Sequence, residues 1–243
     1  MKTLDKKLAL SRFLIYGVLA AKKDTRTLVF FSGGKDSLVM TDIICTVVDE
    51  ENLRCPDFVV GDPFPFDETV KYIERIMDDY GVKNYTFWHE LIKDADEVNE
   101  EWVSKNRFEC CKRYKIDMMK DIIRSKDYEV VFVGIRADEH PSRSGAGYIR
   151  IEQDPVHVRV HPLFEWTLRD VWEYIVANKL EVNPLYYRGY MSIGCRYCTF
   201  KNAPEFNDVT EIFDYVVRGI NERSGRAQDK EEIMDRLRAL GYF

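Results

Sequence analysis

The sequence predicts an α/β protein in which a mostly parallel sheet is sandwiched between helices. Two short apolar runs, Thr27–Phe31 (TLVFF) and Val130–Gly134 (VVFVG), are typical of buried strands. Longer helical patterns separate such runs, and strands that alternate with helices favour a parallel sheet. The chain has 243 residues, enough for one large domain or one domain with a small appendage.

Residues 1–26 are expected to form an N-terminal packing helix. One helical face carries the apolar residues Leu4, Leu8, Ile15 and Leu19. The near-apolar run from Phe13 to Ala21 is about nine residues long, far shorter than the ~20 that a membrane span needs. A signal peptide is the alternative, but Asp5 and Arg12 lie in its flanks. We therefore expect a cytoplasmic protein with no membrane partner.

Residues 27–204 are expected to form the main domain. Its predicted elements are strands at 27–31, 57–60, 84–88, 130–134 and 156–160, helices at 38–48, 66–80 and 168–176, and a mostly helical stretch from 94 to 124. Residues 205–243 are polar and are expected to form a helical C-terminal tail. Ligands of parallel sheets bind beyond the carboxyl ends of the strands, where the loops 32–37 and 135–147 fall.

The charge balance disfavours an unassisted, sequence-independent nucleic-acid binder. The chain has 36 Lys and Arg against 42 Asp and Glu, a net charge of −6. A local basic strip remains compatible with nucleic acid that is presented within a complex. Arg218, Arg223 and Arg226 of the tail are candidates for such a strip, although a solvated helix face is the simpler interpretation.

The loop SGGKDS, between a buried strand and a helix, predicts a phosphate site. Its residues are Ser32, Gly33, Gly34, Lys35, Asp36 and Ser37. The two glycines bring backbone amides close to an anion, the helix adds its positive end, and Lys35 adds a charge. Asp36 would be misplaced beside bare phosphate, so we infer a bridging Mg²⁺. The loop is not a Walker A motif. The alternative is a solvated turn.

The cysteines indicate a metal centre. Four of the six form two tight pairs, Cys110–Cys111 and Cys195–Cys198. Four thiolates fit either tetrahedral zinc or a [4Fe–4S] cluster, and adjacent cysteines can hardly bind one ion without strain, which favours the cluster. Buried thiols without metal are the remaining alternative. Cys45 is expected to be an inert core residue.

These motifs resemble the ATP pyrophosphatases, whose PP-loop is SGGKDS. GIRADEHPSR (134–143), HPLFEWTLRDVWEYI (161–175) and NPLYYRGYMSIGCRYC (183–198) resemble the phosphoadenosine phosphosulfate (PAPS) reductase branch of that group. The resemblance covers roughly residues 25–205. It implies an adenine nucleotide alpha hydrolase-like fold, with 27–204 as the nucleotide-binding domain.

The resemblance also implies roles for individual residues. CC followed by Y-x-x-G-Y-x-S-I-G-C-x-x-C is similar to the cluster signature of bacterial adenylylsulfate (APS) reductases, so a [4Fe–4S] cluster on the four paired cysteines is implied. Arg136 and Arg143 lie in the loop that contacts the substrate's anionic group in that family. We expect them to act with Lys35 and Asp36 in catalysis. The alternative is that either arginine pairs with Asp138 or Glu139 in a surface loop.

Two departures from the reductases direct the functional prediction. The reductases use a cysteine in a C-terminal E-C-G-[IL]-H motif, whereas the last cysteine here is Cys198. The reductases also carry an altered loop, whereas this chain keeps the complete one, Lys35 included. We expect an ATP pyrophosphatase that adenylates a substrate oxygen for sulfur transfer, as in DNA phosphorothioation or RNA thiolation. A partner such as a cysteine desulfurase would supply sulfur.

Two alternatives stay open at this point. One is an APS or PAPS reductase-like enzyme whose catalytic thiol is supplied elsewhere. The other is a non-catalytic ATP-binding subunit of a sulfur-modification complex.

Overall fold

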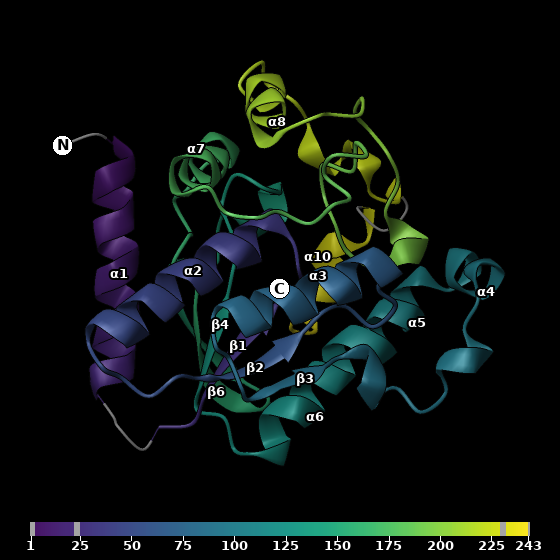
Figure 1. Cartoon of the computed structure of the whole chain (residues 1–243). Helices are drawn as coiled ribbons and strands as arrows, with labels where there is room; N and C mark the ends of the chain where they lie inside the picture. Colours follow the sequence, from purple (N-terminus) through teal and green to yellow (C-terminus); the bar gives the residue numbers. More distant parts are fainter. Residues whose placement is uncertain (1–2, 22–24, 229–231, 243) are drawn as a thin grey trace.

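A six-stranded sheet forms the centre of the molecule, and all but one of its strands run parallel (Figure 1). The computed structural model describes residues 3–21, 25–228 and 232–242. The strand order is β3-β2-β1-β4-β6-β5, and only β5 is antiparallel to its neighbour. The strands are β1 (Thr27–Phe31), β2 (Asp57–Val60), β3 (Tyr85–Phe87), β4 (Val130–Val133), β5 (Ile149–Gln153) and β6 (Val156–Val160).

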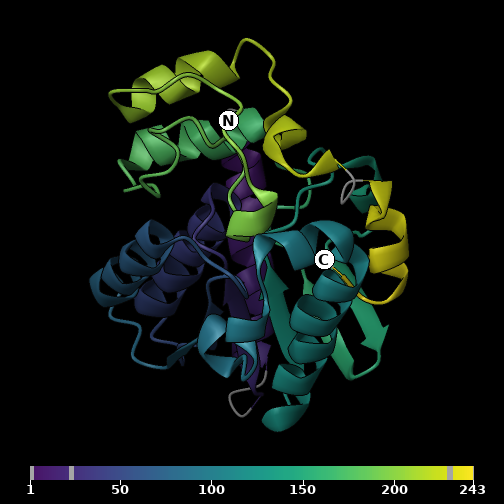
Figure 2. The same ribbon diagram turned by 90° about the vertical axis from the view of Figure 1, so that its right-hand side faces the viewer.

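Helices cover both faces of the sheet, as Figure 2 shows from the side. They are α1 (Thr3–Ala21), α2 (Lys35–Glu50), α3 (Asp67–Asp79), α4 (Glu100–Lys105), α5 (Arg107–Cys111), α6 (Met118–Ser125), α7 (Leu168–Asn178), α8 (Val209–Val216) and α10 (Met234–Ala239). Helices α1, α2, α3, α7 and α8 share the larger hydrophobic core, and α6 packs into the core on the other face. Among the described residues, no helix is long and apolar enough to cross a membrane.

Strand β1 shows why the sheet needs helices on both sides. Val29 and Phe31 pack into the larger core, whereas Leu28 and Phe30 pack toward α6. Because successive strand residues point to opposite faces, an uninterrupted apolar run is stable only when both faces are covered.

The predicted fold class is confirmed, and so are the strands at 27–31, 57–60 and 156–160. Strand β5 has no counterpart in the sequence-based prediction. Its five residues are exposed or half-buried, so they lack the apolar run that identifies a buried strand. The stretch 94–124 is mostly helical, but turns divide it into short helices around a π-helical segment, η3 (Lys112–Asp117).

The carboxyl ends of β1 and β4 create the place where a ligand fits. The chain leaves β1 toward β2 on one side, while β4 lies on the other side of β1, so the loops after β1 and β4 diverge. Gly134, directly after β4, allows close approach to the start of α2: a Cβ there would lie 3.1 Å from the Asp36 backbone. Because Gly134 packs closely against the start of α2, both loops lie at the same cavity.

The segment from 183 to 198 depends on a glycine at position 189. Gly189 has a φ of +84°, and a Cβ there would lie 2.2 Å from the Ala203 carbonyl oxygen. We predict that Gly189→Ala lowers the free energy of unfolding by at least ~2 kcal/mol, from backbone strain plus the clash. Urea unfolding followed by circular dichroism measures this.

Gly81→Ala is the matched control for that substitution. Gly81 also has a positive φ, +63°, but nothing lies within 4 Å of its added Cβ. The Gly81→Ala substitution should lower the free energy of unfolding only by the backbone strain, about 1 kcal/mol. Equal losses for the two variants would contradict the steric explanation.

Candidate nucleotide and cysteine sites

A polar cavity opens at the carboxyl ends of β1 and β4. Its walls come from the loop after β1, the loop after β4, the segment before Cys195 and the C-terminal segment. The lining residues that carry charge are Lys35, Asp36, Asp62, Lys115, Glu139, Arg143, Arg223 and Arg226. The cavity is therefore formed by chain segments that are more than 200 residues apart, from Phe30 to Tyr242.

The loop Ser32–Ser37 is folded tightly onto the start of α2. Gly33 has a φ of +77°, and Gly34 is the N-cap residue of α2 without a side-chain cap. The Ser32 and Ser37 hydroxyl oxygens lie 3.2 Å apart, and the Ser37 hydroxyl donates to the Gly34 carbonyl at 2.9 Å. This geometry gathers two hydroxyls at the positive end of α2, an arrangement suited to an anion.

Two side chains of the segment 183–198 brace this loop from outside. The Lys35 amide donates to the Tyr186 hydroxyl at 2.8 Å. The Asn183 side-chain amide donates to Thr69 Oγ1 at 3.0 Å and to the Gly33 carbonyl at 3.3 Å. Both residues are buried, so the loop conformation is set by tertiary contacts as well as by its glycines.

Lys35 lies in a buried network of charges. It contacts Asp36 Oδ2 at 2.9 Å and the carboxylate of Glu222. Arg136, which is fully buried, donates to Asp36, to Glu222 and, at 2.9 Å, to Asp138. Burial disfavours the charged ammonium, but Asp36 and Glu222 raise the pKa of Lys35 above its ordinary value. Lys35 therefore carries its charge into the cavity.

The same contacts decide where the two candidate arginines lie. Arg143 lines the cavity, whereas Arg136 lies behind Asp36 and Glu222 and is not among the lining residues. Both pair with neighbouring carboxylates of their own loop, Arg136 with Asp138 and Arg143 with Glu139. Arg136 is thus placed to hold Asp36 in position, and Arg143 to meet a ligand.

A second group of charges forms the opposite wall. Glu139 is paired with Arg143 and, at 2.8 Å, with Arg223. Burial alone would raise the pKa of Glu139, but the two arginines reverse this effect and hold it well below its ordinary value. Arg226 completes the wall and donates to Thr199 Oγ1 at 3.1 Å. We call these three guanidinium groups and one carboxylate the positive wall.

The interpretation of Arg223 and Arg226 as a solvated helix face is wrong. Both are buried, in and beside the 3-10 turn η6 (Glu222–Gly225), and only Arg218 is exposed. The Arg226 guanidinium occupies the space over Gly194, where a Cβ would lie 2.4 Å from Nη1. The absent side chain at Gly194 therefore accommodates Arg226.

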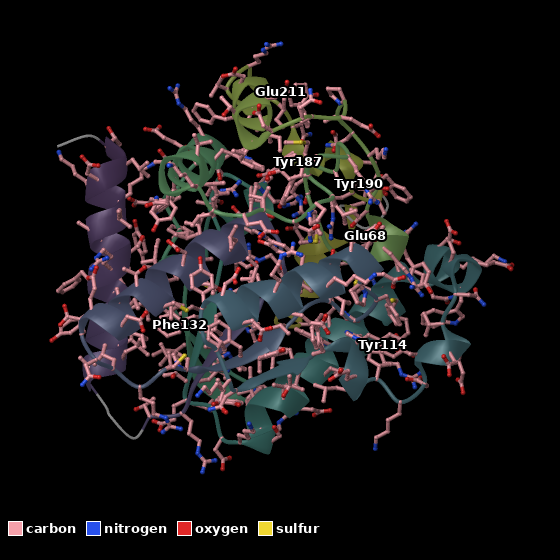
Figure 3. The ribbon with its side chains drawn as sticks, in the orientation of Figure 1. Glu68, Tyr114, Phe132, Tyr187, Tyr190 and Glu211 are labelled. Atoms are coloured by element: carbon pink, nitrogen blue, oxygen red, sulfur yellow. The ribbon has the colours of Figure 1, made fainter. Side chains whose placement is uncertain are left out.

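The four paired cysteines line one small buried cavity next to the first. Cys110 and Cys111 end α5, and Cys195 and Cys198 flank the turn η5 (Arg196–Cys198). Pro63, Phe64, Val103, Tyr114 and Tyr197 supply most of the other walls. Tyr114, labelled in Figure 3, lies on the α5–α6 side of the molecule, away from Tyr187 and Tyr190. Helices of two distant segments thus bring both pairs together.

Polar groups surround these thiols. Arg107 Nη1 lies 3.1 Å from Cys198 Sγ, and Cys195 Sγ lies 3.7 Å from Asp62 Oδ1. Lys115 pairs with Asp62 and lines both cavities. Burial raises the pKa of the Cys110 thiol well above its ordinary value, and the neighbouring Cys195 thiol raises it further. A thiolate at this depth needs positive charge beside it, from cations or from bound metal.

The donor set of the cysteine cavity fits an iron–sulfur cluster in the number and kind of its ligands. Four thiols around a shared cavity match the four ligands of a cubane, whose irons are spread apart. For Mg²⁺, the carboxylates that line the first cavity are Asp36, Asp62 and Glu139, and Glu139 is paired with two arginines.

Comparison with known proteins shows the family. The profile described as the phosphoadenosine phosphosulfate reductase domain matches residues 26–201. The chain belongs to the PAPS reductase family. It is 29% identical to adenosine 5'-phosphosulfate reductase 1 of Bacillus subtilis over 171 residues, which are 69% of this chain and 71% of that protein. It is 32% identical to the Mycobacterium tuberculosis reductase, over 68% of this chain and 59% of that one.

Solved structures show that this PAPS reductase family fold is shared more widely. Yeast FAD synthetase, in complex with FAD, superimposes with a TM-score of 0.66 at 15% identity, covering 93% of this chain and 90% of that one. The U34-tRNA thiolase NcsA of Methanococcus maripaludis, with its [4Fe-4S] cluster, gives a TM-score of 0.57 at 13% identity, covering 99% and 80%. The expected PP-loop fold is thereby confirmed.

The structure adds site residues that the sequence-based prediction missed. Asn183 and Tyr186 lie inside a recognised motif, so the motif itself was the available signal. Glu222 had none, because an isolated charge in a polar tail resembles any solvated residue, and Arg223 was predicted only as part of a basic strip, not of this site. Their burial in this member of the PAPS reductase family arises only when the tail returns to the sheet.

Glu139 provides a test of the positive wall by pH. Its folded-state pKa is depressed, so its stabilising contribution is complete above the unfolded value of about 4.3 and is lost as pH falls through the folded value. We predict that Glu139→Gln costs about 3 kcal/mol at pH 7, because it leaves two buried arginines short of charge. The difference from the parent chain should shrink below about pH 4.

Urea unfolding curves at pH 7 and at acid pH measure this difference. Glu101→Gln is the control, since Glu101 is exposed and pairs with Lys105 one helical turn away. It should change stability little. A Glu139→Gln effect that is small at pH 7, or constant with pH, would show that the pair is not buried as described.

Proposed function

We propose that this member of the PAPS reductase family binds ATP and transfers its adenylyl group to a substrate oxygen, which is then replaced by sulfur. The observation that carries this proposal is the complete SGGKDS loop, with Lys35 charged and buried at the cavity wall. ATP has three phosphates, whereas an adenylylsulfate has one. A site for ATP therefore needs groups that bind two additional phosphates. A loop with two hydroxyls, a helix end and a lysine supplies partners for them.

The proposed first step uses these groups as follows. The acceptor oxygen attacks the α-phosphorus of ATP, the bond from that phosphorus to the bridging oxygen breaks, and pyrophosphate leaves with the electron pair. Lys35 and the hydroxyls of Ser32 and Ser37 stabilise the charge that develops on pyrophosphate. Asp36, held by Arg136, would bind the Mg²⁺ that accompanies the triphosphate.

The positive wall suits the acceptor side of the reaction. Arg143, Arg223 and Arg226 are all buried at the cavity, where Glu139 pairs with the first two. Guanidinium groups bind phosphate and related oxyanions through paired donors. We therefore propose an anionic acceptor, such as a nucleic-acid phosphodiester or a nucleotide of RNA presented within a complex.

The second step requires a sulfur nucleophile. The terminal sulfur of a donor persulfide attacks the activated centre, and AMP leaves with the former acceptor oxygen. A thiol reductant then attacks the donor's inner sulfur, which breaks the S–S bond, leaves the terminal sulfur on the product and forms a disulfide between the thiol and the donor. We propose that a partner such as a cysteine desulfurase provides this sulfur. A [4Fe–4S] cluster held by Cys110, Cys111, Cys195 and Cys198 would supply fixed charge and local order beside the cavity, since all of its irons would be ligated.

Reduction of APS or PAPS is the second candidate function. The curated relatives that favour it are named adenosine 5'-phosphosulfate reductases. The positive wall would also hold a sulfonucleotide. Release of sulfite from APS or PAPS with a thiol reductant is the measurement that would establish this function.

Nucleotide binding separates the two candidates without knowledge of the acceptor. We predict that calorimetric titration finds tighter binding of an α,β-methylene ATP analogue with Mg²⁺ than of APS. Lys35→Ala should weaken binding of the analogue roughly 10- to 100-fold and of AMP far less, because the lysine meets the outer phosphates.

Lys201→Ala is the control, because Lys201 is half exposed and pairs with Glu205 outside the cavity. It should leave both affinities unchanged. If APS binds more tightly than the analogue and Lys35→Ala affects both alike, the adenylating function is wrong. Normal pathway function of a Lys35→Ala, Ser37→Ala variant would instead indicate a non-catalytic ATP-binding subunit.

The cysteine cavity gives a separate prediction. After anaerobic reconstitution, the chain should hold about four iron and four sulfide per molecule, with absorbance near 400 nm. Each of Cys110→Ser, Cys111→Ser, Cys195→Ser and Cys198→Ser should lose most of that iron, and a strong chelator should lower the thermal midpoint of the parent protein.

Cys45→Ser and Cys55→Ser are the matched controls, since both lie outside the cavity. They should retain the iron. Binding of one zinc per chain in place of iron and sulfide would contradict the cluster assignment.

A further inference from the structure

Strand β5 is an open edge of the sheet with an apolar surface. It pairs only with β6, and it ends the strand order. Ile149 is 54% exposed and Ile151 is 64% exposed, while Val156 at the start of β6 is 72% exposed. Figure 2 shows this hairpin at one side of the sheet, beside the C-terminal helix. Soluble proteins usually protect such an edge, because its free backbone groups and apolar side chains attract another strand.

The hydrogen-bonding pattern shows which backbone groups face outward. The His161 amide donates to the Tyr148 carbonyl at 2.8 Å, and the register pairs Arg150 with Arg159 and Glu152 with His157. In an antiparallel ladder the bonded pairs alternate, so 148, 150 and 152 bond to β6. The amides and carbonyls of 149, 151 and 153 consequently point away from the sheet.

These outward groups restrict how a second β5 strand can pair. Two antiparallel copies must place odd-numbered residues opposite odd-numbered residues to exchange hydrogen bonds. Centring the pair on Ile151 sets Arg150 of one copy opposite Glu152 of the other, twice. A shift of the centre to 150 sets Arg150 against Arg150, and a shift to 152 sets Glu152 against Glu152. Opposite charges favour a cross-strand pair and like charges disfavour it.

We propose that two copies of this chain pair along β5, in antiparallel register centred on Ile151, to form a continuous twelve-stranded sheet. Each strand contributes its outward backbone groups at 149, 151 and 153. Arg150 is 42% exposed and already lies 3.0 Å from Glu152 of its own chain. Glu152 is 12% exposed and also lies 3.3 Å from Arg159, so Arg150 of the second copy would join this existing group of charges.

The apolar side chains complete the same register. Cross-strand partners lie on one face, so Ile151 and its partner Val158 stand in line. In the dimer the two Ile151 side chains meet, giving a row of Val158, Ile151, Ile151 and Val158 across both copies. Ile149 lies opposite Gln153 of the second copy and near its Val156. The side chains most exposed on this hairpin are thus the ones that the pairing covers.

Sedimentation velocity of the full chain tests the pairing. A single strand contact is small for a protein interface, so we expect a dimer that dissociates in the range of about 1–100 μM. Ile151→Lys should raise the dissociation constant at least tenfold, because it buries charge at the two-fold centre. Phe13→Lys, on the exposed face of α1, is the matched control and should leave it unchanged.

Charge reversal tests the register. Arg150→Glu sets Glu against Glu in its homodimer, and Glu152→Arg sets Arg against Arg, so each variant alone should dissociate at least tenfold more readily. A mixture of the two should form a heterodimer, since each chain then meets the opposite charge at both positions. The double variant, Arg150→Glu with Glu152→Arg, should regain the homodimer.

Circular dichroism and thermal unfolding check that each variant is folded before it is scored. A monomer at 200 μM would overturn the proposal. So would a dimer that Phe13→Lys disrupts and Ile151→Lys does not, or two charge variants that fail to associate when mixed. These measurements involve no nucleotide, so their outcome is independent of the proposed activity.

Discussion

The buried ion network of Lys35, Asp36, Arg136 and Glu222 is the constraint on which the nucleotide cavity depends. These four charges come from the loop after β1, the loop after β4 and the C-terminal segment. A buried charge that loses its partner costs several kcal/mol, so none of the three segments can move away without penalty. The network therefore fixes the walls of the cavity as well as its charge.

A second consequence concerns the neighbouring cysteine cavity. Lys115 and Asp62 form a pair that lines the nucleotide cavity, while Lys115 also lines the cysteine cavity. Cys195 lies 3.7 Å from the same carboxylate. A change of charge among the thiols therefore alters the electrostatic potential in the nucleotide cavity through this shared ion pair. Solvent screens the effect little, because the pair is buried.

The PAPS reductase family fold leaves the choice of chemistry to the loops. The sheet supplies only a switch point at which two loops diverge. The loop after β1 brings two hydroxyls, a lysine and a helix end to the cavity, and Arg143, Arg223 and Arg226 bring three guanidinium groups to it. Under the proposed function, the first feature binds the phosphates of ATP and the second binds an anionic acceptor.

The sequence by itself determined the parallel α/β fold, the phosphate loop and the four cysteines, because each depends on local patterns: apolar runs of strand length, glycines beside a lysine, and paired thiols. It could not determine β5, whose exposed residues carry no burial pattern, or the roles of Glu222, Arg223 and Arg226. A charge far along the chain enters a site only when long-range packing places it beside its partner. Only the tertiary structure decided which of these charges enter the site, since the free energy of burying them depends on contacts that no local pattern encodes.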